Sequence, residues 1–268
     1  MSNNEIFMGK LFYQLILLSS LFFSQLTATE LSLEEEMATK INLLGEAHSF
    51  SYIDLRLTNT ELNLIDQLSF TKIEGTSVQY DRFGDIHLLR EELANFLKSI
   101  GNDNEEVIST VTDIISRTSE QVVKASKKDT AWVCVRASKP TKAFDIPRWH
   151  MDGAYYGFNG PNPYPGLVFK FAASLKGSST LLYNLPNDKR DLFTAHMYDR
   201  TFLSQLLDLN KAESPKKGEG VFFIVANTKI GAIHSEPKIH ENRLFFSILV
   251  GDKAEIEELY LRWHPTKL

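Results

Sequence analysis

Pro147-Arg148-Trp149-His150-Met151-Asp152-Gly153 is the stretch from which the β-rich half of this chain is best interpreted. Side chains two positions apart on a strand lie on the same face, so His150 and Asp152 can point into one pocket. A His-x-Asp pair is common in proteins, so alone it is weak evidence for a metal site. The evidence is strengthened by a later strand-like stretch, Gly231 to Pro237, which contains His234 and precedes a strand beginning at Arg243. These residue types predict a metal site built on strand ends.

The length and composition are those of an ordinary globular protein. A chain of 268 residues can form one large domain or two small ones with a substantial core. Its 43% hydrophobic and 24% charged residues argue against a disordered chain, and a net charge of −5 gives no general attraction to nucleic acid or anionic membrane. The single cysteine, Cys134, excludes an internal disulfide and zinc sites built on cysteine pairs, and its apolar neighbours predict a buried thiol.

The first 28 residues contain an apolar run from Leu11 to Phe23, preceded by Lys10 and followed by Ala28. This pattern is typical of a signal peptide, which would make the protein exported or lumenal. The alternative is an apolar helix packed on the domain of a cytoplasmic protein. The run is short for a transmembrane helix, so membrane contact is expected only if the segment is retained.

Residues 29–130 have the apolar spacing of amphipathic helices and are predicted to form a helical region that covers the rest of the domain. Capping residues and glycines place the ends of these helices. The expected helices span residues 33–45, 60–68, 86–100 and 104–128.

Residues 131–268 change to short runs rich in β-branched and aromatic residues, divided by Gly, Pro and Asn. The expected strands span residues 131–137, 148–152, 167–175, 179–184, 221–226, 230–235 and 243–250. This spacing favours an antiparallel sandwich or barrel over alternating βα units, and hence an α+β fold. A helical insertion at residues 188–210 is placed to act as a lid, and residues 254–263 are expected to form a final helix or an extended tail.

Other common sites of chemistry are missing from the sequence, which has no phosphate loop, Gly-x-Gly-x-x-Gly turn or Gly-x-Ser-x-Gly elbow. His150, Asp152 and His234 remain as a set with complementary roles. Two histidines and one carboxylate with open coordination positions form the facial triad of non-haem iron(II) oxygenases. Arg243 and Ser247 share a face by the period of two, so they can bind an acidic cosubstrate together.

The order of these motifs resembles that of the iron(II)- and 2-oxoglutarate-dependent dioxygenase superfamily, in a poorly characterised bacterial branch. The motifs are His150-x-Asp152, the Gly177 to Thr180 strand start, a distal histidine and an arginine on the next strand. The resemblance extends over about half the chain, from Trp132 to Gly251. It implies a double-stranded β-helix, which is a jelly-roll or cupin-like fold.

The resemblance also implies roles for particular residues. His150, Asp152 and His234 would bind iron(II), and no catalytic residue is expected beyond this metal site. Arg243 would bind the distal carboxylate of 2-oxoglutarate, with Ser247 as a further donor. Less specific expectations are a cosubstrate contact from Tyr183 or Asn184 and substrate contacts from Arg148, Tyr155 and Tyr156.

The implied reaction consumes 2-oxoglutarate and dioxygen, releases succinate and carbon dioxide, and hydroxylates an unidentified substrate. His240 competes with His234 as the distal ligand. His234 is preferred because it is expected at a strand end, nine positions before Arg243. Two rival interpretations stay open: another metal-dependent enzyme on a cupin-like barrel, with Glu236 or Tyr155 in acid–base work, and a non-catalytic β-barrel binding protein whose histidines are structural.

Overall fold

A computed structural model of the chain describes residues 31–45, 47–153, 168–227 and 229–264. From Leu33 onward the described residues belong to one compact unit. The predictions for residues 1–28 and for Tyr155 and Tyr156 lie outside the described residues. Within the described ranges, no helix has the length and apolar character needed to cross a membrane.

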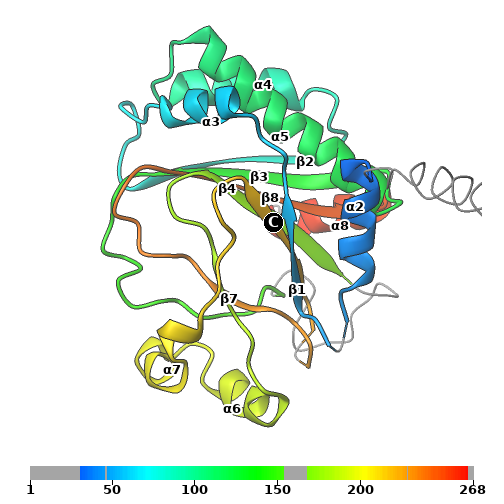
Figure 1. Cartoon of the computed structure of the whole chain (residues 1–268), viewed down its shortest axis with the longest axis vertical. Helices are drawn as coiled ribbons and strands as arrows, with labels where there is room; N and C mark the ends of the chain where they lie inside the picture. The colour runs from blue at the N-terminus through cyan, green and yellow to red at the C-terminus, as the bar shows by residue number, and fades with distance from the viewer. Residues whose placement is uncertain (1–30, 46, 154–167, 228, 265–268) are drawn as a thin grey trace, which may run out of the picture. The chain divides into compact units, whose positions relative to one another are not determined.

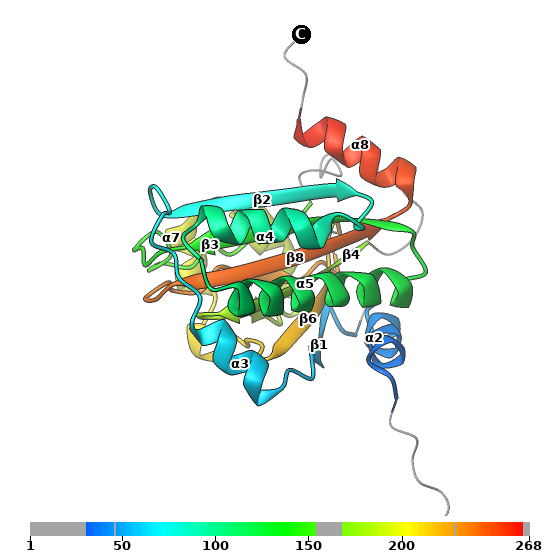
Figure 2. The same ribbon diagram turned by 90° about the horizontal axis from the view of Figure 1, so that it is seen from above.

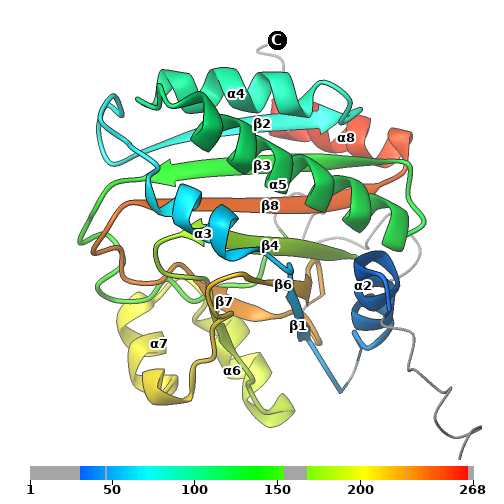
Figure 3. The same ribbon diagram turned by 45° about the horizontal axis from the view of Figure 1, so that its top comes forward.

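A six-stranded sheet is the main scaffold, and every strand pair in it is antiparallel. Its strands in spatial order are β1 (Phe50–Asp54), β6 (Glu219–Ile224), β4 (Phe169–Lys176), β8 (Arg243–Gly251), β3 (Thr130–Ser138) and β2 (Ser77–Gly84) (Figure 3). A second, two-stranded antiparallel sheet pairs β5 (Leu181–Tyr183) with β7 (Ile233–Ser235). The predicted combination of helices with antiparallel strands is therefore confirmed.

Helices cover one face of the large sheet (Figures 1 and 2). The covering helices are α3 (Asn59–Asp66), α4 (Leu89–Ser99) and α5 (Glu105–Ala125), while α2 (Leu33–Asn42) packs against β1 and α5. The helix-facing side chains of β8, Leu244, Phe246 and Ile248, are fully buried in one core with the apolar stripe of α5. Burial of this stripe, rather than helix propensity, holds α5 on the sheet.

The opposite face of the sheet carries the alternate residues of the same strands, including Phe245 and Leu249 of β8. The small sheet and the insertion helices α6 (Arg190–Ala195) and α7 (Arg200–Leu206) lie on this side (Figure 1). The rings of Phe223 on β6 and His234 on β7 are 4.9 Å apart between centroids. The two sheets therefore meet at this point, and chemically useful side chains gather between them.

The structure corrects several expected elements. The first half of the chain is not purely helical, because it supplies β1 and β2, the two edge strands of the large sheet. Residues 148–152 form no regular strand and make a single β-bridge, His150 with His234. The expected strands at 179–184 and 230–235 are reduced to three residues each. The insertion is divided into two short helices, and residues 253–263 form the helix α8 (Lys253–Trp263).

Candidate metal centre

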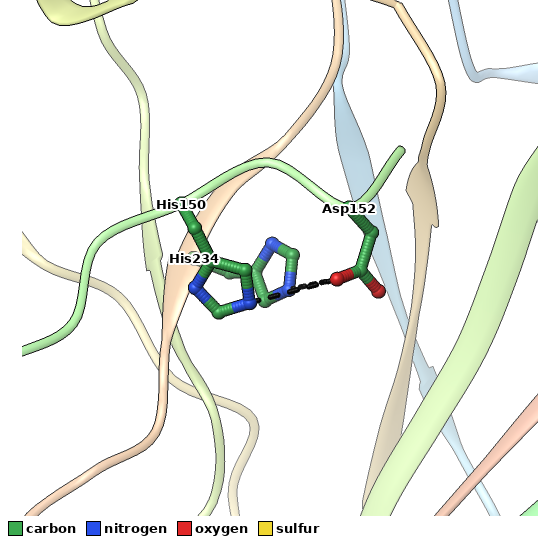
Figure 4. A group of neighbouring side chains, drawn as sticks. All are labelled: His150, Asp152 and His234. Carbon is green, nitrogen blue, oxygen red and sulfur yellow. Dashed lines mark ion pairs between the residues drawn. The ribbon is translucent and has the colours of Figure 1, made fainter. Parts of the chain in front are cut away.

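His150, Asp152 and His234 converge on one point (Figure 4). One ligand atom from each side chain lies within 4.8 Å of the others. The Nε2 atoms of His150 and His234 are 3.5 Å and 3.6 Å from Oδ1 of Asp152. Ligands 2.0–2.2 Å from a metal ion and at right angles to each other are about 3 Å apart, so a small contraction would place all three atoms in coordination distance.

The backbone fixes the two segments that carry these side chains. His150 and His234 exchange both backbone hydrogen bonds, each with an N to O distance of 2.9 Å. The backbone N–H of Ala226 donates to the carbonyl oxygen of Asp152 at 2.7 Å. Trp149 and Met151 alternate with the two polar residues and are buried in a separate apolar cluster under α6 and α7. Their burial turns His150 and Asp152 toward the large sheet.

Both imidazoles turn Nε2 toward Asp152 and Nδ1 toward a backbone carbonyl oxygen. Nδ1 of His150 lies 2.7 Å from the carbonyl oxygen of Arg148, and Nδ1 of His234 lies 3.1 Å from that of Ala232. A carbonyl oxygen can only accept, so Nδ1 carries the proton and Nε2 keeps its lone pair. Burial, followed by the nearby His150, holds the pKa of His234 below its ordinary value. The neutral imidazole that a metal ion requires is thus the favoured form at neutral pH.

Lys170 of β4 binds the second carboxylate oxygen of Asp152, Oδ2, which faces away from the two histidines. Its Nζ is 2.8 Å from Oδ2 of Asp152, and both side chains are largely buried. Burial alone would raise the pKa of Asp152, but Lys170 first and then His234 and His150 hold this pKa well below its usual range. Lys170 also lies 5.5 Å from the centroid of the Trp132 ring. The ion pair keeps Asp152 charged and leaves Oδ1 directed at the two histidines.

Replacing Lys170 with methionine is expected to raise the pKa of the Asp152 carboxyl, because the opposite charge is lost while burial stays. A folded pKa below the unfolded value of about 3.9 contributes stability above that pH, and this stability is lost as pH falls through the folded pKa. The variant should lose this contribution. Carbon-13 NMR titration of the Asp carboxyls measures the shift, with Lys176→Met on the same strand as the control. An unchanged Asp152 titration would contradict the assigned role.

Arg243 is a buried cation on the same face of the large sheet. It is 2% exposed, and burial lowers the pKa of its guanidinium to about 10. Its Nε donates to the carbonyl oxygen of Ser178 at 2.8 Å, and its guanidinium lies 4.7 Å from the centroid of the Phe245 ring. Among the ion pairs of the described residues, none includes Arg243. A buried charge without a carboxylate partner is costly, and such a position favours binding of an anion.

Arg190 of α6 links the insertion to both segments of the metal centre. This buried guanidinium donates from Nη1 to the carbonyl oxygen of Gly231 at 2.9 Å, and the same atom lies 4.0 Å from Sδ of Met151. Met151 stands between His150 and Asp152, and Gly231 precedes β7. The insertion therefore supports the backbone that presents the three side chains.

The other predicted site residues are placed as follows. Ser247 is buried and lies on the Arg243 face of β8, as predicted. Tyr183 does not face the metal centre, which corrects the prediction: its ring packs against Trp149, whose side chain points away from His150 and Asp152. Asn184 follows β5 and is exposed, and His240 is exposed in the connection between β7 and β8. His234, and not His240, belongs to the three-residue group with His150 and Asp152.

Lys170 and Arg190 were not predicted from the sequence as part of the site. A signal for Lys170 was present, because it is the only charged residue in Leu167-Val168-Phe169-Lys170-Phe171-Ala172-Ala173. A lysine inside an apolar strand requires a buried partner, and the earlier aspartate is such a partner. Arg190 has no comparable signal, since it lies in the polar stretch Asn187-Asp188-Lys189-Arg190-Asp191.

Comparison with known proteins gives matches among solved structures alone. No family model matches the chain, and no curated protein matches it significantly. Solved structures that resemble it include a dioxygenase for auxin oxidation from rice, with 8% identity, a TM-score of 0.40, and coverage of 82% of this chain and 79% of that one. A prolyl-4-hydroxylase from Pseudomonas putida has 9% identity, a TM-score of 0.39, and coverage of 81% and 98%.

An oxidoreductase of the 2OG-Fe(II) oxygenase family from Burkholderia pseudomallei has 10% identity, a TM-score of 0.39, and coverage of 82% of this chain and 90% of that one. Likenesses at this level do not establish a shared fold or activity. The assignment of a function therefore depends on the geometry of the metal centre and on Arg243.

Proposed function

We propose that the protein is an iron(II)- and 2-oxoglutarate-dependent oxygenase that hydroxylates a substrate. The proposal is supported by one observation: a potential metal site and a buried arginine lie on the same face of the large sheet. His150, Asp152 and His234 converge with free Nε2 atoms and one carboxylate oxygen, and Arg243 is a buried cation that no described carboxylate pairs. The first feature fits a metal ion and the second fits the far carboxylate of a dicarboxylate cosubstrate.

The donor set fits iron(II) on chemical grounds. Two imidazoles and one carboxylate form a facial triad that leaves coordination positions for other ligands. When bound, iron(II) lets 2-oxoglutarate and dioxygen react so that one oxygen atom enters succinate, the other enters a C–H bond of the substrate, and carbon dioxide leaves. The chain itself supplies the three ligand side chains, keeps Asp152 ionised through Lys170, and packs the apolar ring of Phe223 against His234.

The proposal includes the fold and its division. The strands β3, β4, β6 and β8 of the large sheet and the β5–β7 pair would be the two halves of a double-stranded β-helix within residues 131–268, with Ser247 assisting Arg243. Residues 29–130 would be cladding around this core, although β1 and β2 make that division less sharp. Support comes from the antiparallel pairing and from β7, which places His234 against the large sheet.

Anaerobic addition of ferrous iron and then 2-oxoglutarate to the purified chain tests the proposal. We expect one iron bound per chain, a weak visible charge-transfer band when 2-oxoglutarate is added, and succinate after admission of air. Zinc or nickel retention without 2-oxoglutarate turnover would instead favour another metal-dependent enzyme on the same scaffold. A protein that binds neither metal nor 2-oxoglutarate would contradict the proposal and favour a non-catalytic binding protein.

A further inference from the structure

We propose that the primary substrate carries an anionic group, a carboxylate or a phosphate, that binds to Arg136 and Arg148. These two residues are called the arginine pair. The proposal rests on the function proposed above and specifies the substrate class of the same site. It is carried by the positions of three charged side chains beside the metal centre, namely the arginine pair and Glu236.

Both guanidinium groups approach one carboxylate oxygen. Nη2 of Arg148 is 2.5 Å from Oε1 of Glu236, and Nη1 of Arg136 is 3.8 Å from the same atom. Nε of Arg148 donates to the other oxygen at 3.3 Å, and Arg136 also donates to the neutral side chain of Gln79. The three charged groups together carry a net charge of +1. This positive charge beside the metal centre attracts anions, and a guanidinium group can bind a carboxylate or a phosphate through paired hydrogen bonds.

The arginine pair adjoins the metal centre. Arg148 lies two residues before His150, and Glu236 lies two residues after His234, on backbone segments joined by the His150–His234 bridge. Residues two apart on such extended segments project to the same side. Arg136 of β3 is opposite Phe245 of β8, the ring that the Arg243 guanidinium contacts. An anion held by the pair would thus stand beside both the metal centre and the cosubstrate arginine.

The arginine pair is exposed to solvent, whereas Arg243 is buried. The side chains of Arg148 and Arg136 are 51% and 35% exposed, whereas Arg243 is 2% exposed. A deeply buried cation fits a small cosubstrate that is enclosed completely. Cations open to solvent fit a group on a larger molecule that docks from outside, and they also attract that molecule electrostatically.

Calorimetric titration of the full chain tests this inference. The protein is loaded with manganese(II) and saturating 2-oxoglutarate, so that Arg243 is occupied and no turnover occurs. Benzoate, phenyl phosphate and benzamide are then added as a carboxylate, a phosphate and a neutral probe. We expect at least one anion to bind about 10-fold or more tightly than benzamide, and Arg148→Gln or Arg136→Gln to weaken it by about 10-fold. Preference between benzoate and phenyl phosphate identifies which anionic group the substrate carries.

Two further variants sharpen the result. Arg90→Gln is the matched control, because Arg90 is an exposed arginine on α4 paired with Asp113, and it should bind the probes as the parent does. Glu236→Gln removes the competing carboxylate and should tighten anion binding, which is a gain that misfolding cannot imitate. Equal binding of benzamide and the anions, or weakened 2-oxoglutarate binding with unchanged probe binding in Arg148→Gln, would overturn the inference.

The same titrations keep this inference separate from the proposed oxygenase activity. Binding of manganese(II) and 2-oxoglutarate is measured first, and its failure counts against the oxygenase. The probe titrations are repeated on metal-free protein, where the arginine pair is still present. One contrary outcome is a metal-free protein that shows no preference for the anionic probes over benzamide, although the same protein binds manganese(II) and 2-oxoglutarate when they are added. That result would contradict the inferred substrate class and leave the proposed oxygenase activity untouched.

Discussion

Replacing Asp152 with alanine is expected to lower the affinity for ferrous iron by at least about 100-fold and to abolish succinate formation. Mutations that only disturb the residues behind metal ligands already cost 10- to 100-fold, and this change removes the only anionic ligand. It also removes the carboxylate that pairs with the Lys170 ammonium group at 2.8 Å. The positive charge of Lys170 beside the site then repels a divalent cation more strongly, so the loss should exceed that of a simple ligand deletion.

Anaerobic equilibrium dialysis against ferrous iron, followed by metal analysis, measures this loss. His240→Ala is the matched control, because His240 is an exposed histidine in the connection before β8 and lies outside the three-residue group. It should retain one iron per chain and normal succinate production. If His240→Ala lost the metal while Asp152→Ala kept it, the assigned centre would be wrong.

Most of the candidate metal centre could be predicted from sequence, because two of its three residues belong to one short motif and all three are of types that bind metals. His150 and Asp152 are two positions apart, and only a pleated, extended segment is needed to bring them to one side. Choosing His234 over His240 used only the positions of strand ends and turns. The backbone geometry was harder to predict. The segment at His150 makes a single β-bridge in place of the expected strand, yet His150 and Asp152 still point to the same side, as expected for a strand.

Other features depend on tertiary contacts that no local pattern records. The edge strand β2, Ser77–Gly84, contains the polar residues Gln79, Asp81 and Arg82, and aspartate in particular is rare in strands. Their polar groups are satisfied by distant partners, such as the Trp132 indole N–H that donates to Asp81. Tyr183 was assigned to the cosubstrate because the neighbouring strand start resembled a family motif. Its side chain instead faces the apolar cluster of the insertion.

Replacing Arg243 with methionine is expected to weaken 2-oxoglutarate binding by about 100-fold or more while leaving iron binding intact. Truncating one partner of a buried charge pair costs roughly 2–5 kcal/mol, and the far carboxylate would then be left without its cation. The unfolding free energy should change much less. The guanidinium is a buried charge whose described polar contacts are the Ser178 carbonyl and the Thr180 hydroxyl, so its removal also relieves a desolvation cost.

Comparing the two quantities in one variant separates binding from folding. Titration of the iron-loaded protein with 2-oxoglutarate gives the affinity, and urea unfolding of the free protein gives the stability. Arg117→Met serves as the control, since Arg117 pairs with Glu61 among the helices on the covered side of the sheet and should affect stability only. Parallel losses of stability and affinity in Arg243→Met would show that Arg243 is a structural cation. A selective loss of affinity would show that this buried charge is kept for an anionic ligand.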